Sequence, residues 1–171
     1  IAFAATHEQL TFYTLKGIHR NLFSDVYPWA GKPRTVPLYK GESTFAAVDR
    51  INENWFQTLM DGFNRAIRKE PDRLRHHLGE LWGRLNWFHA FPEGNGRSTQ
   101  LFLTILARRH GHDIEWARVD PDQEHAAAVA SIQNNFAPYQ LLLIGPLVKR
   151  EATHTLSPGW IEKEPRNSKE K

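Results

Sequence analysis

Residues 89–97, HAFPEGNGR, bring together side chains that could do chemistry on a phosphate group. The Gly94-Asn95-Gly96 turn leads into an expected helix, whose first backbone N–H groups have no partner inside the helix. Such a helix start favours anions, and glycine leaves room for a phosphate to approach the backbone closely. Arg97 adds a fixed positive charge that suits phosphate oxygens. The stretch therefore indicates an anion-binding turn.

Two other side chains of the stretch could supply metal and acid–base chemistry. Glu93 would repel a phosphate directly, but it could hold a Mg²⁺ ion that bridges the two, because this ion prefers oxygen ligands. His89 is the one group of the nine that can accept a proton near neutral pH. Phe91 is expected to turn inward and anchor the loop. A lone Gly-Asn-Gly is usually only a turn, and a lone histidine at a helix end is usually a cap or a core residue. It is their combination that indicates a site.

The hydrophobic periodicity predicts an all-α fold in which two helices position this stretch. Apolar residues three or four apart predict a bundle of about six to seven helices. The expected helices cover 8–23, 47–69, 71–89, 96–110, 121–134 and 138–150. His89 then lies at the end of one helix, and the glycine turn opens the next.

Residues 25–46 interrupt the helical pattern. They contain three prolines and two glycines, which exclude a helix over most of the stretch. The segment 34–39 has strand character, and the residues that follow it can turn the chain back. We therefore expect a short β-hairpin flap, whose free backbone groups could pair with an extended peptide.

Composition indicates a single domain with a well-supplied core. The chain has 171 residues, of which 40% are hydrophobic, and no cysteine, which excludes disulfides and thiolate metal sites. The domain is expected to cover residues 1–150. Prolines, a glycine and alternating charges predict that residues 151–171 form a flexible tail or the start of a further region. No apolar run is long enough to cross a membrane, so no membrane partner is expected.

The charge pattern argues against nucleic acid as the main partner. The net charge is +3, and the basic residues are interspersed with acidic ones along the whole chain. A mixed, solvated surface is the better interpretation, and nucleic-acid binding stays as the lesser alternative. His76 and His77 are expected on the surface or facing a partner, because neighbouring helical residues point about 100° apart and no third metal ligand is in register.

HAFPEGNGR resembles the signature of the Fic family, H-x-F-x-[DE]-G-N-G-R-x-x-R, a family of nucleotide-transferring enzymes with an all-helical fold. The likeness extends to IHRNLFSDVYPWAG at 18–31 and to KGESTFA at 40–46. It also covers the Gly-His-Asp sequence after the fourth expected helix, and so reaches over about residues 8–150. The resemblance implies a Fic-type helical bundle with a flap.

The resemblance also implies an activity, namely transfer of AMP from ATP to a Ser, Thr or Tyr hydroxyl of a target protein, with release of pyrophosphate. His89 would deprotonate the hydroxyl, and Glu93 would hold Mg²⁺ on the α- and β-phosphates. Asn95, with the backbone of Gly94 and Gly96, would position these phosphates, and Arg97 would bind the β-phosphate. The flap would pair with the target through Lys40, Gly41, Glu42, Ser43, Thr44 and Phe45.

One departure from the signature bears on the activity. Gln100 stands where the family has its final arginine, which helps to hold the γ-phosphate and pairs with an inhibitory glutamate. The alternative interpretation is therefore a Fic-fold binding or toxin-partner module with weak catalysis or another nucleotide donor. The family's self-inhibition motif is absent. Either a separate antitoxin-like protein supplies the glutamate, or this control does not operate. The expected location is the bacterial cytoplasm, or the host cytosol for a translocated effector.

Overall fold

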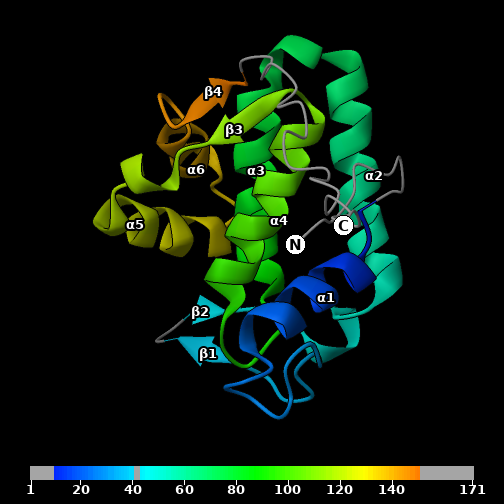
Figure 1. Cartoon of the computed structure of the whole chain (residues 1–171). Coiled ribbons are helices and arrows are strands. Elements are labelled where there is room, and N and C mark those ends of the chain that lie inside the picture. Colours follow the sequence, from blue (N-terminus) through cyan, green and yellow to red (C-terminus); the bar gives the residue numbers. More distant parts are fainter. Residues whose placement is uncertain (1–9, 41–42, 151–171) are drawn as a thin grey trace, which may run out of the picture.

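The computed structural model describes residues 10–40 and 43–150, and helices dominate this part of the chain (Figure 1). The α-helices are α1 Phe12–Phe23, α2 Glu53–Lys69, α3 Leu74–Phe88, α4 Asn95–Arg109, α5 Pro121–Ile132 and α6 Ala137–Leu142. Short 3-10 helices cover Val48–Arg50, Pro71–Arg73 and Trp116–Arg118. Strand β1 (Tyr39–Lys40) pairs with β2 (Ser43–Thr44), and β3 (His112–Ile114) pairs with β4 (Leu147–Lys149), both antiparallel. The predicted all-α bundle with a hairpin flap is confirmed.

Side-chain caps explain where several helices begin. The Thr11 hydroxyl accepts the N–H of Thr14 at the start of α1, and the Thr14 hydroxyl accepts the N–H of Thr11 in return. Asn52 accepts the N–H of Trp55 in the same way and opens α2. Asp120 accepts two N–H groups at the start of α5, whose first residue is a proline. Each cap satisfies N–H groups that lack partners inside the helix.

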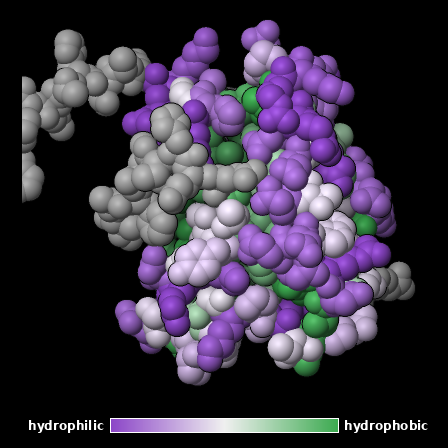
Figure 2. Space-filling view, turned by 90° about the vertical axis from the view of Figure 1, so that its right-hand side faces the viewer, coloured by the Kyte–Doolittle hydropathy of each residue, from purple (hydrophilic) through white to green (hydrophobic). Residues whose placement is uncertain are grey.

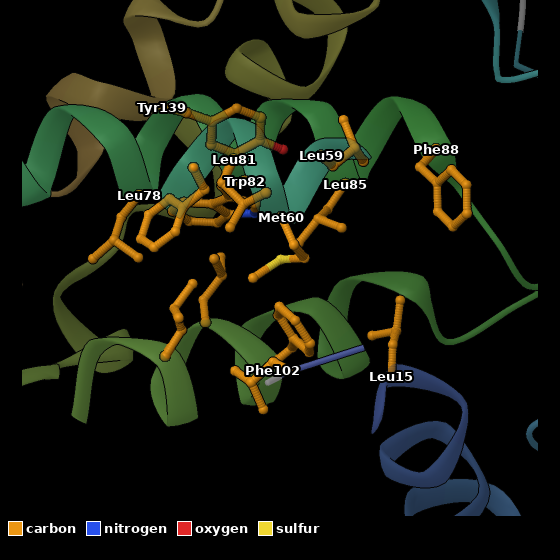
Figure 3. Close-up of a cluster of buried hydrophobic side chains, with 14 of the residues drawn as sticks. Leu15, Leu59, Met60, Leu78, Leu81, Trp82, Leu85, Phe88, Phe102 and Tyr139 are labelled. Carbon is orange, nitrogen blue, oxygen red and sulfur yellow. The ribbon is translucent and has the colours of Figure 1, made fainter. Parts of the chain in front are cut away.

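Helix α3 runs through the centre of the core (Figure 3). It packs against α2, α4, α5 and α6, and its buried side chains meet Met60 of α2, Phe102 of α4 and Tyr139 of α6. Gly79 lets α6 come close, because a Cβ at this position would lie 2.5 Å from the Cα atom of Gln140. The buried α3 side chains are Leu74, His77, Leu78, Leu81, Trp82, Leu85 and Phe88. The end of α3, which carries His89, is therefore held from several sides.

The prediction of one helix over 138–150 is wrong. Helix α6 ends at Leu142, and the chain then turns through Gly145, whose φ of 86° is left-handed. Residues Leu147–Lys149 form β4 and pair with β3. Two causes act together. Gly145 and Pro146 disfavour a helix at this point of the chain, and β3, which is distant in sequence, offers a strand edge with which residues 147–149 form hydrogen bonds.

The prediction that His77 lies on the surface or faces a partner is also wrong. Its side chain is 5% exposed, and its Nε2 atom has no hydrogen-bond partner among the described residues. The nearest acidic oxygen is an Oε2 atom of Glu70, 3.8 Å away. Because α3 is covered on several sides, a polar residue on it can face inward, whereas the adjacent His76 is only partly buried.

In the described part of the chain, no group of three or more His, Cys, Asp or Glu residues could hold a metal ion.

The outer surface is polar and carries both signs of charge. Figure 2 shows the side on which α2 lies, where hydrophilic residues cover most of the face and hydrophobic atoms show in smaller patches. Several charges are paired locally, as in Arg84 with Glu80 and Arg118 with Glu115. Across residues 10–40 and 43–150, no helix is long and apolar enough to span a membrane.

Candidate active site

His89 ends α3 in an unusual backbone conformation. Its φ of 42° and ψ of 62° are left-handed, which is uncommon for a residue with a Cβ atom. Its N–H still donates to the carbonyl of Leu85, at 3.1 Å, so His89 closes the helix while the chain changes direction. The next two residues, Ala90 and Phe91, are buried. The expectation that Phe91 turns inward is confirmed.

The His89 side chain is oriented by two contacts. Its Nδ1 atom lies 3.2 Å from the carbonyl oxygen of Asn86, and because a carbonyl can only accept, Nδ1 carries the hydrogen. In the neutral ring, Nε2 is then the basic nitrogen. The ring also stacks on Phe45 at 3.9 Å between centroids and an interplanar angle of 21°. The structure therefore presents a histidine of defined tautomer at the end of α3.

Asn95 closes the loop between α3 and α4. Its Oδ1 accepts the N–H of Phe91 at 2.9 Å, and its Nδ2 donates to the carbonyl of Phe91 at 2.7 Å. Both ends of the amide are thus bonded to the loop backbone, so the Asn95 side chain fixes the shape of the loop. This arrangement holds the first turn of α4 in place.

The first turn of α4 is open to the solvent. Gly94 precedes it with a φ of 82°, and a Cβ there would lie 2.5 Å from the ring of Phe23. At Gly96, by contrast, a Cβ would meet no atom within 4 Å. Arg97 is exposed, its guanidinium lies over the Phe23 ring at 4.5 Å, and no acidic residue occupies the turn. Free N–H groups, an open backbone and a cation together suit a phosphate.

His19, on α1, supports the loop between α3 and α4. It is fully buried, its Nδ1 accepts the N–H of Gly31 at 2.9 Å, and its Nε2 therefore carries the hydrogen and donates to the carbonyl of Glu93 at 2.9 Å. Burial lowers the pKa of His19; the bond to the Glu93 carbonyl opposes this shift and the charge of Arg97 adds to it. The ring lies 3.9 Å from that of Phe91. A neutral histidine thus joins α1 to the loop between α3 and α4.

The flap lies beside the loop that joins α3 to α4 (Figure 1). Tyr39 pairs with Thr44, both are exposed, and the hairpin base is tied to α3 because the N–H of Ala46 donates to the carbonyl of Trp87 at 2.9 Å. Lys40 pairs with Ser43, whereas Gly41 and Glu42 lie outside the described residues. Phe45 is buried against His89 rather than placed on an outer edge.

Gln100 lies one turn beyond Arg97 on α4. Its amide donates to an Oε1 atom of Glu124 on α5, at 3.4 Å. Burial raises the pKa of Glu124, and the bond to Gln100 partly opposes this rise. Arg108, at the far end of α4, pairs with Asp113, so it does not replace the missing arginine. The position of the signature's last arginine is thus filled by a neutral amide that faces an acid.

Two buried residues of the site were missed in the sequence, His19 and Arg34. Arg34 is 3% exposed, and its guanidinium donates to the carbonyl of His89 at 2.8 Å. Burial lowers the pKa of this guanidinium. His19 falls within the stretch 18–31 that carries the family likeness, which was the one available signal. The residues that neighbour an arginine or a histidine in the sequence do not show whether its side chain is buried or lies on the surface.

Comparison with known proteins shows the family of this chain. The family model of the Fic/DOC family matches residues 9–107, which include the whole His89–Arg97 stretch. The protein adenylyltransferase VbhT of Bartonella schoenbuchensis is 34% identical over 142 residues, which are 81% of this chain and 28% of the relative. A protein adenylyltransferase of Bartonella henselae is 26% identical over 134 residues, 68% of this chain and 25% of the relative. The chain thus spans less than a third of these relatives.

A solved structure shares the fold. The BepC protein of Bartonella tribocorum, a VirB-translocated effector with bound AMPPNP, superposes with a TM-score of 0.66 at 19% identity. The match covers 85% of this chain and 80% of that one. At this level of identity the likeness concerns the fold.

Proposed function

This chain belongs to the Fic/DOC family, and we propose that it is a protein adenylyltransferase that transfers AMP from ATP to a Ser, Thr or Tyr hydroxyl of a target protein. The observation that carries the proposal is the geometry of one loop. The Nδ1–H of His89 is held by a backbone carbonyl, and this histidine lies across the loop from the open first turn of α4 with Arg97. Relatives that match most of this chain are named protein adenylyltransferases.

The proposed reaction uses His89 as a general base. Its Nε2 takes the proton of the target hydroxyl as the oxygen attacks the α-phosphorus. The bond from this phosphorus to the oxygen that bridges to the β-phosphate breaks, and pyrophosphate leaves. The N–H groups of α4 and the guanidinium of Arg97 compensate the phosphate charge, which is the main demand of such a transfer.

A magnesium ion fits the acid of this loop. Glu93 is exposed, and its Oε1 accepts the N–H of Gly94 at 3.0 Å, so the carboxylate is held beside the phosphate turn. Mg²⁺ in nucleotide sites usually takes one or two carboxylates together with substrate phosphates and water, so a single glutamate suffices. When bound, the ion would neutralise charge on the α- and β-phosphates. The role of Glu93 is to hold it there.

The flap is the proposed site for the target segment. Tyr39 and Thr44 are exposed on it, and the hairpin lies beside His89. An extended peptide that adds to a strand edge would be aligned by its main-chain hydrogen bonds. BepC is a translocated effector, so a host protein is one candidate target and a protein inside the bacterium is the other.

The second candidate function is a Fic-fold module with weak transfer or with another nucleotide donor. The specific observation is Gln100, which bonds to Glu124 where the signature has an arginine. A neutral amide beside an acid offers less attraction to a third phosphate. An antitoxin-like partner that supplies an inhibitory glutamate would also lack its usual arginine here.

Labelled ATP separates the two candidates. The chain is incubated with a cell lysate as the target pool and with ATP labelled at the α- or the γ-phosphate. We expect protein labelling from the α position only, and a loss of about 10²- to 10⁴-fold in His89→Asn, the range for removal of a general base. Asparagine is chosen because it tolerates the left-handed backbone at this position.

The matched control is His125→Asn, because His125 is exposed on α5. It should transfer label like the wild type. No α-label in the wild type, or equal labelling by His89→Asn, would count against adenylyl transfer. Labelling from the γ-phosphate would indicate a kinase reaction instead.

A further inference from the structure

The guanidinium of Arg34 has an uncommon set of partners. It is buried, and its Nε and two terminal nitrogens donate to three backbone carbonyls. No carboxylate in the described part of the chain pairs with it. A buried cation whose partners are all neutral carbonyls fixes geometry, because each donor has its own direction in a planar fork.

The three carbonyls belong to the flap and to the end of α3. The Nε atom donates to His89 at 2.8 Å, one terminal nitrogen to Val36 at 2.9 Å, and the other to Ala46. Val36 precedes the hairpin and Ala46 follows it. One side chain therefore joins both ends of the flap to the backbone of the proposed base.

Neighbouring backbone bonds strengthen this junction. The N–H of Arg34 donates to the carbonyl of Ala90 at 2.8 Å, and that of Ala46 donates to Trp87 at 2.9 Å. Because His89 caps the end of α3, its carbonyl has no N–H donor within that helix. Arg34 supplies this donor.

We propose that Arg34 is a positioning residue that couples the flap to His89, so that the segment expected to hold the target also sets the orientation of the base. This role rests on the proposed function of His89. Without the guanidinium, three carbonyls lose a donor, and His89 and the flap can move independently. Misplacement of a reacting group by about 1 Å can lower a rate about a hundredfold.

The test uses the full chain with Arg34→Met and Arg34→Lys, and with Arg65→Met as the control, because Arg65 is exposed on α2. Label transfer from α-labelled ATP and ATP affinity are measured together. In Arg34→Met we expect transfer to fall about ten- to a hundredfold while ATP affinity stays within about twofold. The transfer rate of Arg34→Lys should lie between those of the wild type and Arg34→Met, since one amine cannot reach all three carbonyls. Arg65→Met should match the wild type.

Two spectroscopic readouts report the coupling itself. Side-chain ¹⁵N shifts of His89 should show the Nδ1–H tautomer in the wild type and a mixture in Arg34→Met. Exchange of the Ala46 amide, which bonds to Trp87, should speed up at least about tenfold. Unchanged tautomer and exchange in Arg34→Met overturn the proposal, and so does a loss of ATP affinity as large as the loss of transfer. If the Met variant does not fold, a Lys variant equal to the wild type in every readout overturns it.

These readouts separate the two proposals. If the wild type transfers no label from ATP, the proposed function fails. The tautomer of His89 and the exchange of Ala46 still show whether Arg34 couples them.

Discussion

Gln100 of α4, which pairs with Glu124 of α5, lies about one helical turn beyond the His89–Arg97 loop, yet the loop and the Gln100–Glu124 pair are held in different ways. Around the loop, polar side chains bond to backbone groups, as His19 does at 2.9 Å to two segments and Asn95 does at 2.7 and 2.9 Å to Phe91. Gln100 and Glu124 bond only to each other by their side chains, at 3.4 Å.

This difference means that the loop contacts fix the geometry of the backbone, whereas the Gln100–Glu124 pair mainly sets the local charge. The contacts around the loop hold His89 and the first turn of α4 in place, and a substitution that breaks them lowers the stability of the fold. The Gln100–Glu124 pair can change its charge while the backbone stays in place. The comparison therefore predicts that variants of the loop support lose stability, whereas variants of the pair mainly change nucleotide affinity.

Gly94→Ala should have the largest effect on stability. The new Cβ would lie 2.5 Å from the buried Phe23 ring, and the φ of 82° disfavours any side chain. We expect the free energy of unfolding to fall by about 4 kcal/mol, from overpacking and the left-handed backbone together. Urea denaturation followed by circular dichroism measures this change.

Two other glycines serve as controls for this prediction. Gly62→Ala, in the interior of α2 with open space around it, should gain up to about 1 kcal/mol from helix propensity. Gly96→Ala also meets no atom, so the fold should tolerate it, while ATP affinity should fall about tenfold if a phosphate approaches this backbone. A Gly94→Ala protein as stable as the wild type would show that the loop is not rigidly supported.

His19→Phe should have the next largest effect. The ring fits among Phe91 and Phe23, but the N–H of Gly31 and the carbonyl of Glu93 lose their partners. Two unsatisfied groups of this kind cost about 3 kcal/mol together. Chemical denaturation at pH 7.5 measures the difference from the wild type.

The loss of stability in His19→Phe should depend on pH. The pKa of folded His19 lies below that of the unfolded chain, so the unfolded state takes up the proton first as pH falls. The stabilisation by His19 is complete above about pH 6.5 and decreases as pH falls toward the folded pKa. The difference in free energy of unfolding between the wild type and His19→Phe should therefore become smaller at acidic pH. A difference that grows would mean that His19 is charged in the folded protein.

The sequence indicates the local parts of the candidate site. Nine consecutive residues hold the proposed base, the proposed metal ligand and the glycine turn, and the periodicity of the flanking helices predicts that this turn joins two of them. His19 and Arg34 act over separations of 74 and 55 residues, on the carbonyls of Glu93 and His89. Local pattern does not tell which carbonyl a fold leaves without a donor, so these two residues required the structure.

The two errors have the same physical origin. Residues 138–150 are apolar enough for a helix, and their last part becomes a strand because distant β3 offers an edge. His77 is buried because helices far apart in sequence cover α3. In both cases tertiary packing overrides what the neighbouring residues favour.

Glu124→Gln should give the smallest effect, and its main effect should be on ATP affinity. Removal of one negative charge near the proposed phosphate site should strengthen ATP binding by about 1 kcal/mol, or about fivefold, with little change for AMP. The free energy of unfolding at pH 7.5 should rise slightly, since burial disfavours the carboxylate, while the lost bond to Gln100 is long and links only side chains. Glu115→Gln is the matched control, because Glu115 is exposed and paired with Arg118 in a separate part of the chain.

The pH dependence sharpens this last prediction. Burial raises the pKa of Glu124, so its carboxylate takes up a proton at a higher pH than an ordinary glutamate does. The advantage of Glu124→Gln over the wild type in ATP affinity should therefore shrink as pH falls through that pKa. Calorimetric titration with ATP across this range measures it. An affinity that Glu124→Gln leaves unchanged at pH 7.5 would place the third phosphate away from Gln100, and the absence of the signature's last arginine would then have no bearing on the donor.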